Sequence, residues 1–229
     1  MARKRLWCRV AGWLMLCFFP LLTFAQTSGK NEDPIVKLLL KETPNIKFAN
    51  EANIEKGGTS KWLVVEVEFV ATEKKVSRDK YSWIDNLRVQ FDILIPSTYN
   101  GKPVYALLSG ETIYWGIPLD GKQHLIDGFV PPQVLHRYLR DGVKLSKTVL
   151  DDFDARISLY TKDKRLLARY YNVKKANGVG EVSRRFDQAE DGVTGGVIRV
   201  KDAIYPRNKS PWQYVSFGSM DLIKPDESK

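Results

Sequence analysis

One run of twelve residues, 85–96 (DNLRVQFDILIP), limits what this chain can fold into more than any other stretch. Every second residue from Leu87 to Ile95 is apolar, and Asn86, Arg88, Gln90 and Asp92 alternate with them. A period of two is typical of a half-buried antiparallel strand. Residues 61–72 alternate in the same way. The sequence therefore predicts strands whose apolar faces close over one core.

Close turns separate the predicted strands. Asn100-Gly101 suits a tight hairpin, and further turns are expected at 109–110, 119–122 and 161–164. Parallel strands would need long crossover connections, and no helical pattern lies between these runs. The one helical pattern begins at Pro131-Pro132 and ends near residue 140. We expect a mainly β fold, an antiparallel immunoglobulin-like β-sandwich of about eight or nine strands with one short helix.

Residues 1–25 have the features of a secretory signal peptide. Four basic residues, Arg3, Lys4, Arg5 and Arg9, precede an apolar run of residues 10–25, and cleavage is expected before Gln26. The alternative is an uncleaved anchor, but the run is short for a spanning helix and contains Pro20. We expect an exported protein in the periplasm, on the outer surface or secreted, with no stable membrane insertion after cleavage.

The rest of the chain divides by composition. Residues 26–44 are expected to form an N-terminal arm, 45–223 the sandwich domain and 224–229 a polar tail. Inside the domain, residues 174–196 are rich in glycine, and we expect a mobile loop there. It is either a tolerated insertion or a partner-binding loop that orders on contact. In the second case Arg184, Arg185 and Phe186 would be its anchor.

The charge of the chain indicates which classes of partner to expect, and its cysteine content indicates whether disulfides can form. The formal net charge of +9 falls to +5 when the four basic residues of the signal peptide are removed. The remaining charges are mixed in sign, so nucleic acid is not an expected partner. Loose attraction to anionic polysaccharide or membrane surfaces stays open as an alternative. Both cysteines, Cys8 and Cys17, lie in the signal peptide, so the processed chain has no thiol.

No catalytic or metal motif stands out. The two histidines, His124 and His136, have only Asp127 as a nearby additional ligand. The acidic residues at 151–154 lack the spacing of a calcium loop. We therefore predict no catalytic residue, no metal and no cofactor, and a protein that is not an enzyme. A hydrolase with an unrecognised site is the remaining enzymatic alternative.

The aromatic residues are the candidates for binding. Most tryptophans and tyrosines suit strand positions in a core. Trp62, Trp83 and Tyr114 fall off the strongest core faces or beside a charged loop. We predict that these three side chains contact a protein partner, or glycans through exposed aromatic faces.

Three phrases carry a family resemblance: KWLVVEVEF at 61–69, WIDNLRVQF at 83–91 and GIPLDG at 116–121. With the signal peptide before them, they resemble the secreted immunoglobulin-like proteins associated with type IV pilus-like assemblies in Verrucomicrobia, of the Akkermansia type. The resemblance implies a β-sandwich without enzyme activity and a structural, assembly or adhesive role at the cell envelope, with protein partners in a pilus-like assembly. It transfers no functional residues.

Overall fold

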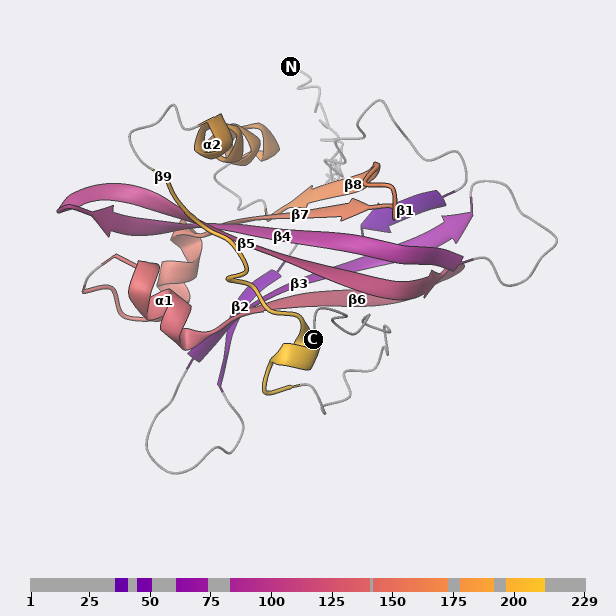
Figure 1. The fold of residues 1–229 in the computed structure, drawn as a ribbon, viewed down its shortest axis with the longest axis horizontal. Coiled ribbons are helices and arrows are strands. Elements are labelled where there is room, and N and C mark those ends of the chain that lie inside the picture. The colour runs from indigo at the N-terminus through magenta and orange to yellow at the C-terminus, as the bar shows by residue number, and fades with distance from the viewer. Residues whose placement is uncertain are drawn as a thin grey trace, which may run out of the picture.

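The computed structural model describes residues 36–40, 45–50, 61–73, 83–140, 142–172, 178–191 and 197–212. These residues form nine strands, two α-helices and two short 3-10 helices (Figure 1). The strands are β1 (Val36–Leu40), β2 (Asn45–Asn50), β3 (Lys61–Glu73), β4 (Trp83–Tyr99), β5 (Lys102–Pro118), β6 (Asp120–Val130), β7 (Asp154–Tyr160), β8 (Leu166–Tyr171) and β9 (Val197–Val200). The helices are α1 (Pro132–Tyr138), η1 (Lys147–Asp152), α2 (Val179–Asp191) and η2 (Arg207–Lys209).

The strands build two sheets. The five-stranded sheet has the order β8-β7-β4-β5-β9. In the four-stranded sheet, β3 pairs with β6 along one edge and with β2 and β1, one after the other, along the opposite edge. The predicted fold class, a mostly β sandwich, is confirmed. One detail of it is wrong, because β9 runs parallel to β5, whereas the other strand pairs that the structure describes are antiparallel.

The core lies between the sheets. From β4 it receives Leu87, Val89, Phe91, Ile93 and Ile95, all at most 1% exposed, as the alternation predicts. The alternating apolar residues of β3 pack against the same core. Burial of one such side chain contributes about 1.5–3 kcal/mol to folding, so these two strands supply much of the stability.

Strands β4 and β5 form a hairpin that extends along the whole length of the molecule (Figure 1). Its turn is Asn100-Gly101, as predicted, and both residues have positive φ, 50° and 73°. That is the geometry of a two-residue type I′ turn. The turn predicted at Ser109-Gly110 is wrong, because β5 continues through it. A Cβ on Gly110 would lie 2.2 Å from the backbone oxygen of Ile204, so this glycine allows a close approach of two chain segments.

The chain after β9 connects the two sheets. β9 pairs with β5 of the five-stranded sheet, and five residues later Tyr205 pairs with Phe129 of β6 in the four-stranded sheet. Tyr205 and Phe129 exchange two backbone hydrogen bonds, of 2.7 and 2.9 Å. Of this connecting segment, only Val197–Val200 is a strand.

Two helices accompany the sheets, and only α1 was predicted. The prediction of a mobile loop at 174–196 is wrong for Val179–Asp191, which form α2. Val182, Phe186 and Ala189 lie on one face of this helix and are buried against the outer face of the five-stranded sheet. The rest of that predicted loop, apart from Gly178, lies outside the described residues. No helix among the described residues is long and apolar enough to cross a bilayer.

The predicted N-terminal boundary also changes. β1 lies in the segment expected to be an arm, yet it pairs with β3 from Val36↔Glu73 to Leu40↔Phe69. The sheet therefore includes residues before position 45. The predicted signal peptide and polar tail lie outside the described residues.

Candidate functional site

Two of the three aromatic side chains predicted to contact partners are buried. Trp62 is 7% exposed, and its ring centroid lies 5.8 Å from that of Trp212 in an edge-on contact. Phe129 stacks on the other side of this cluster, 5.3 Å from Trp212. Tyr114 is 2% exposed and belongs to the main core. The prediction for Trp62 and Tyr114 is wrong. Trp62 lies on the outer face of β3 and is covered by Trp212, whereas Tyr114 lies on the core face of β5, in line with Ala106 and Leu108.

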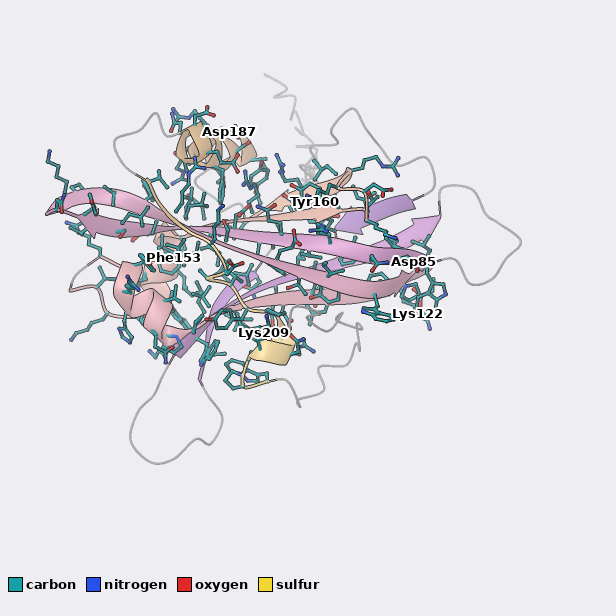
Figure 2. The ribbon with its side chains drawn as sticks, in the orientation of Figure 1. Asp85, Lys122, Phe153, Tyr160, Asp187 and Lys209 are labelled. Atoms are coloured by element: carbon teal, nitrogen blue, oxygen red, sulfur yellow. The ribbon has the colours of Figure 1, made fainter. Side chains whose placement is uncertain are left out.

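Trp83, in contrast, is exposed. Half of its surface is accessible, and its ring lies against Gly116, where an added Cβ would be 3.3 Å from it. Trp115, the residue before Gly116, is 54% exposed. Both tryptophans belong to the open end of the β4–β5 hairpin. Figure 2 shows Asp85, two residues from Trp83, at the end of the molecule far from α2.

The predicted anchor Arg184-Arg185-Phe186 lies on α2 with three different environments. Phe186 is fully buried among Leu94, Leu107 and Tyr171 on the outer face of the five-stranded sheet. The guanidinium of Arg185 makes an ion pair with Asp154, with 3.2 Å between Nη1 and Oδ2. Only Arg184 is exposed. Phe186 is therefore a packing residue and cannot contact a partner unless α2 undocks.

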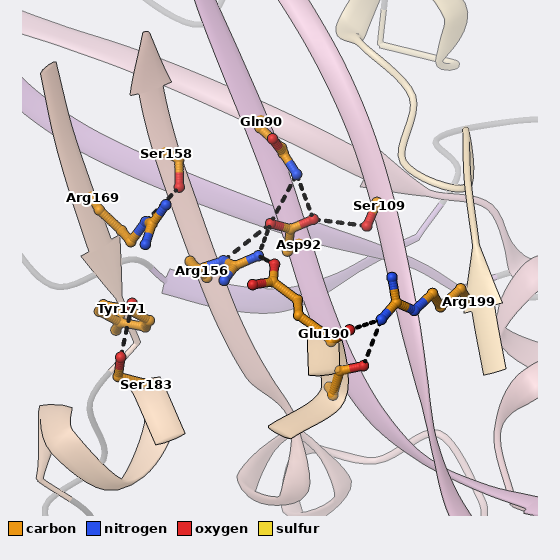
Figure 3. Close-up of polar contacts among 11 residues, drawn as sticks. Gln90, Asp92, Ser109, Arg156, Ser158, Arg169, Tyr171, Ser183, Glu190 and Arg199 are labelled. Atoms are coloured by element: carbon orange, nitrogen blue, oxygen red, sulfur yellow. Dashed lines mark hydrogen bonds and ion pairs between the residues drawn. The ribbon is translucent and has the colours of Figure 1, made fainter. Parts of the chain in front are cut away.

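Under α2 lies a buried charge network centred on Asp92 (Figure 3). Arg156 donates to Asp92 Oδ2 from Nη2 at 2.7 Å and from Nε at 3.1 Å. Ser109 donates to Oδ1 at 2.7 Å, and the Gln90 amide donates to both oxygens. Arg156 also pairs with Glu190 of α2 and lies 4.7 Å from the centre of the Phe186 ring. The network thus joins three strands and the helix.

The network moves the pKa values of its members. Burial alone would lower the pKa of Arg156, but its hydrogen bonds and charge interactions with Glu190 and Asp92 outweigh that and raise it. The hydrogen bond from Arg156 lowers the pKa of Glu190, against the opposing effect of burial. Both groups are therefore charged at neutral pH, which is the state that holds α2 on the sheet.

Two further contacts fasten α2. The hydroxyls of Tyr171 and Ser183 are 3.2 Å apart, and Arg199 of β9 donates to the backbone oxygens of Ala189 and Glu190. A cation at the last carbonyls of a helix is favourable for both hydrogen bonding and the helix dipole. The sequence analysis missed this helix because the five glycines in 174–196 made the whole segment look like a loop. The apolar spacing of Val182, Phe186 and Ala189 was the available signal.

Beside α2 a groove of about 560 Å³ crosses the outer face of the hairpin. Its apolar lining comes from both hairpin strands and from β9, and includes Leu94, Pro96, Pro103, Tyr105 and Val197. Among the described residues of the lining, the charged ones are Arg140, which follows α1, and Arg185 of α2. No pattern in the sequence indicated this site, because it forms where three distant segments meet.

The residues considered for metal binding are not brought together. His124 is buried beside Phe69, with Nε2 3.3 Å from Asp120 Oδ1, whereas His136 is exposed on α1. Asp127 pairs with Arg207 and Asp154 with Arg185. Across the residues that the structure describes, no group of three or more potential ligands could hold a metal ion.

This chain is similar to a protein family and to solved structures. A family model whose description ends in "-like" matches residues 25–175, which is more than half of the chain. A crystal structure of a protein from Akkermansia muciniphila is similar, with a TM-score of 0.60 at 15% sequence identity. That alignment covers 88% of this chain and 98% of the other. At this identity the likeness shows the fold alone. No curated protein matches the sequence.

Proposed function

Because the chain belongs to the family whose model matches residues 25–175, we propose that it is an exported, non-enzymatic binding module of the cell envelope. Its partners are proteins of a pilus-like or other envelope assembly, and its role is structural, adhesive or in assembly. The open end of the β4–β5 hairpin, with Trp83 and Trp115, is the contact surface.

One observation carries this proposal. Within the described residues, the exposed large hydrophobic side chains are Trp83, Tyr99, Tyr105 and Trp115, and all four belong to β4 or β5. Two of them, Trp83 and Trp115, lie at the open end of the hairpin, whereas Tyr99 and Tyr105 lie near its turn. Neighbouring exposed apolar side chains are typical of interaction surfaces, and tryptophan is enriched among residues that dominate binding energy. A rigid hairpin also presents such residues without the entropic cost of ordering a loop.

The buried charged residues support a structural role for the interior. Asp92 accepts hydrogen bonds on both oxygens from Ser109, Gln90 and Arg156, so it has little capacity left to act as a general base. Asp154 and Asp127 are each paired with an arginine from another element. These carboxylates hold different segments of the chain together. Such a structural role is expected for buried charges in a protein whose function is binding.

Export is supported by the sequence of residues 1–25, in which four basic residues precede an apolar run. The family model begins at residue 25, next to the predicted cleavage site before Gln26.

The double variant Trp83→Ala/Trp115→Ala tests the contact surface. We expect it to keep the wild-type melting temperature within about 2 °C, since both side chains are half exposed. In cells that make the protein, it should lose its association with the envelope fraction. Tyr99→Ala, at the opposite end of the hairpin, is the matched control and should behave as wild type. Envelope association unchanged in the double variant would reject the proposal.

Glycan binding is the second candidate, because Trp83 lies with an exposed face on a rigid strand. Affinity electrophoresis in gels that contain a soluble polysaccharide separates it from protein binding. Retardation of the wild-type protein, lost in Trp83→Ala and kept in Tyr99→Ala, would favour a glycan ligand over a protein partner.

A further inference from the structure

We propose that the groove between α2 and the β4–β5 hairpin binds an extended peptide segment of a protein partner, one that carries a carboxylate beside apolar side chains. The inference rests on the proposed function, because it assumes that the protein is a module that binds other proteins. It concerns a different surface, however, since Trp83 and Trp115 do not line the groove.

The floor of the groove suits apolar side chains. Pro96 of β4 lies opposite Tyr105 of β5 in the hairpin register, and Thr98 lies opposite Pro103. Tyr105 is 41% exposed although it borders the groove. Rigid rings and prolines offer contact area at a low cost in conformational entropy.

The lining offers a cation to an anionic ligand. Among the described residues of the lining, the ionisable cations are Arg140 and Arg185, and none is an aspartate or glutamate. The charge of Arg185 is balanced by Asp154, so Arg140 is the main cation for a ligand. Arg185 is held in place by its ion pair with Asp154, and its position on α2 is fixed by the packing of Phe186. Arg140 is exposed, while its backbone N–H donates to the oxygen of Pro96 at 3.1 Å, which anchors its backbone beside the groove. Arginine is well suited to pair with a carboxylate.

The shape and polarity favour a peptide over a fatty acid. The groove is partly open to solvent, so an acyl chain lying in it would keep part of its surface in water. Ser97 and Gln188 also line it, and their hydroxyl and amide groups can pair with peptide N–H and C=O groups. A volume of about 560 Å³ accommodates a few side chains of an extended segment.

The probe is a fluorescein-labelled eight-residue peptide of alternating leucine and glutamate, titrated with the purified protein and followed by fluorescence polarisation. We expect saturable binding that Arg140→Gln weakens about tenfold, because a charge-assisted contact is lost. Arg184→Gln is the matched control, since Arg184 is exposed on α2 outside the groove lining. It should change the Kd by less than about twofold. Tyr105→Ala should weaken binding through the apolar floor.

Several results would overturn this inference. The charge argument fails if a peptide with lysine in place of glutamate binds equally well, or if Arg140→Gln and Arg184→Gln weaken binding equally. The inference also fails if the peptide does not bind at millimolar protein. It fails as well if dodecanoate displaces the labelled peptide at a lower concentration than unlabelled peptide does. The last result would mean a lipid ligand. The variant Trp83→Ala/Trp115→Ala should leave peptide binding intact, so failure here is distinguishable from failure of the proposed function.

Discussion

Asp92 occupies a position where the alternation of β4 places a solvent-facing side chain, yet it is 1% exposed. A buried carboxylate is costly unless opposite charge and hydrogen-bond donors surround it. Arg156, Ser109 and Gln90 supply these groups. The residue is therefore stable only as part of a complete set of partners.

Replacing Asp92 with asparagine should lower the free energy of unfolding by about 3 kcal/mol, since it leaves the buried guanidinium of Arg156 with fewer negative partners. Urea unfolding followed by tryptophan fluorescence measures the change. Asp85→Asn, on the same strand but exposed, is the control and should lie within about 0.5 kcal/mol of wild type. A similar loss in both variants would contradict the assignment of the network.

Glu190 makes the free energy of unfolding depend on pH. The charged groups that face it are Arg156 on β7, Arg169 on β8 and Arg199 on β9, and Asp92 lies behind Arg156. Their effect lowers the pKa of Glu190 in the folded protein below its ordinary value of 4.5. Its contribution to stability is therefore present above pH 4.5 and is lost as the pH falls through the folded-state pKa.

The variant Glu190→Gln tests this contribution. At pH 7 it should be less stable than wild type by about 0.5–1 kcal/mol, a small value because the side chain is 45% exposed. The difference should shrink as the pH falls below 4.5. Melting temperatures recorded from pH 7 to pH 3 give the comparison, and a gap that widens on acidification would have the wrong sign.

At the scale of elements, α2 converts one side of the sandwich into a third layer. It covers the outer face of the five-stranded sheet over Leu94, Leu107 and Tyr171. The salt bridges and hydrogen bonds described above fix its orientation, whereas Phe186 supplies its largest fully buried side chain. The helix also forms one wall of the groove, so its docking controls whether the groove exists.

Phe186→Ala should cost about 3–5 kcal/mol, or undock α2 alone if the helix unfolds locally before the sandwich does. Limited trypsin digestion distinguishes these outcomes, since Arg184 and Arg185 lie on the helix. Cleavage at these sites should be slow in wild type and fast in Phe186→Ala. Arg184→Ala removes an exposed side chain and should not change stability. Equal cleavage rates in wild type and Phe186→Ala would mean that the helix is not held by this packing.

At the scale of the whole molecule, the two long hairpin strands place the exposed tryptophans and the groove at separate ends. Figures 1 and 2 show α2 over the part of the hairpin nearer its turn, and Asp85 at the other end. A binding module with two separate surfaces can join two partners, or two parts of one partner, at a raised effective concentration.

The core of this molecule is large enough to fold without covalent cross-links. If the signal peptide is removed after Ala25, the exported protein contains no cysteine. Its melting temperature and its migration in gels should then be the same with and without reductant, and mass spectrometry should find Gln26 at the N-terminus. A reductant-dependent band would show that Cys8 or Cys17 is retained.

The sequence determined the local features of the sandwich. Alternation in β3 and β4, the Asn100-Gly101 turn and α1 were all predictable, because period, turn chemistry and helix punctuation depend on residues close together in the chain. Trp83 was correctly predicted to be exposed, at the margin of a core face.

Tertiary structure decided which outward faces remain exposed. Trp62 is buried under Trp212, and Phe186 packs on a helix instead of lying in a loop. Tyr114 is different, because it lies on the core face of β5. Period-two alternation states only which residues share a face of a strand. Whether a second layer covers that face depends on segments distant in sequence, here α2 and the chain from β9 to Trp212. The groove has the same origin, because Arg140, Tyr105 and Arg185 meet only when three separate parts of the chain pack together.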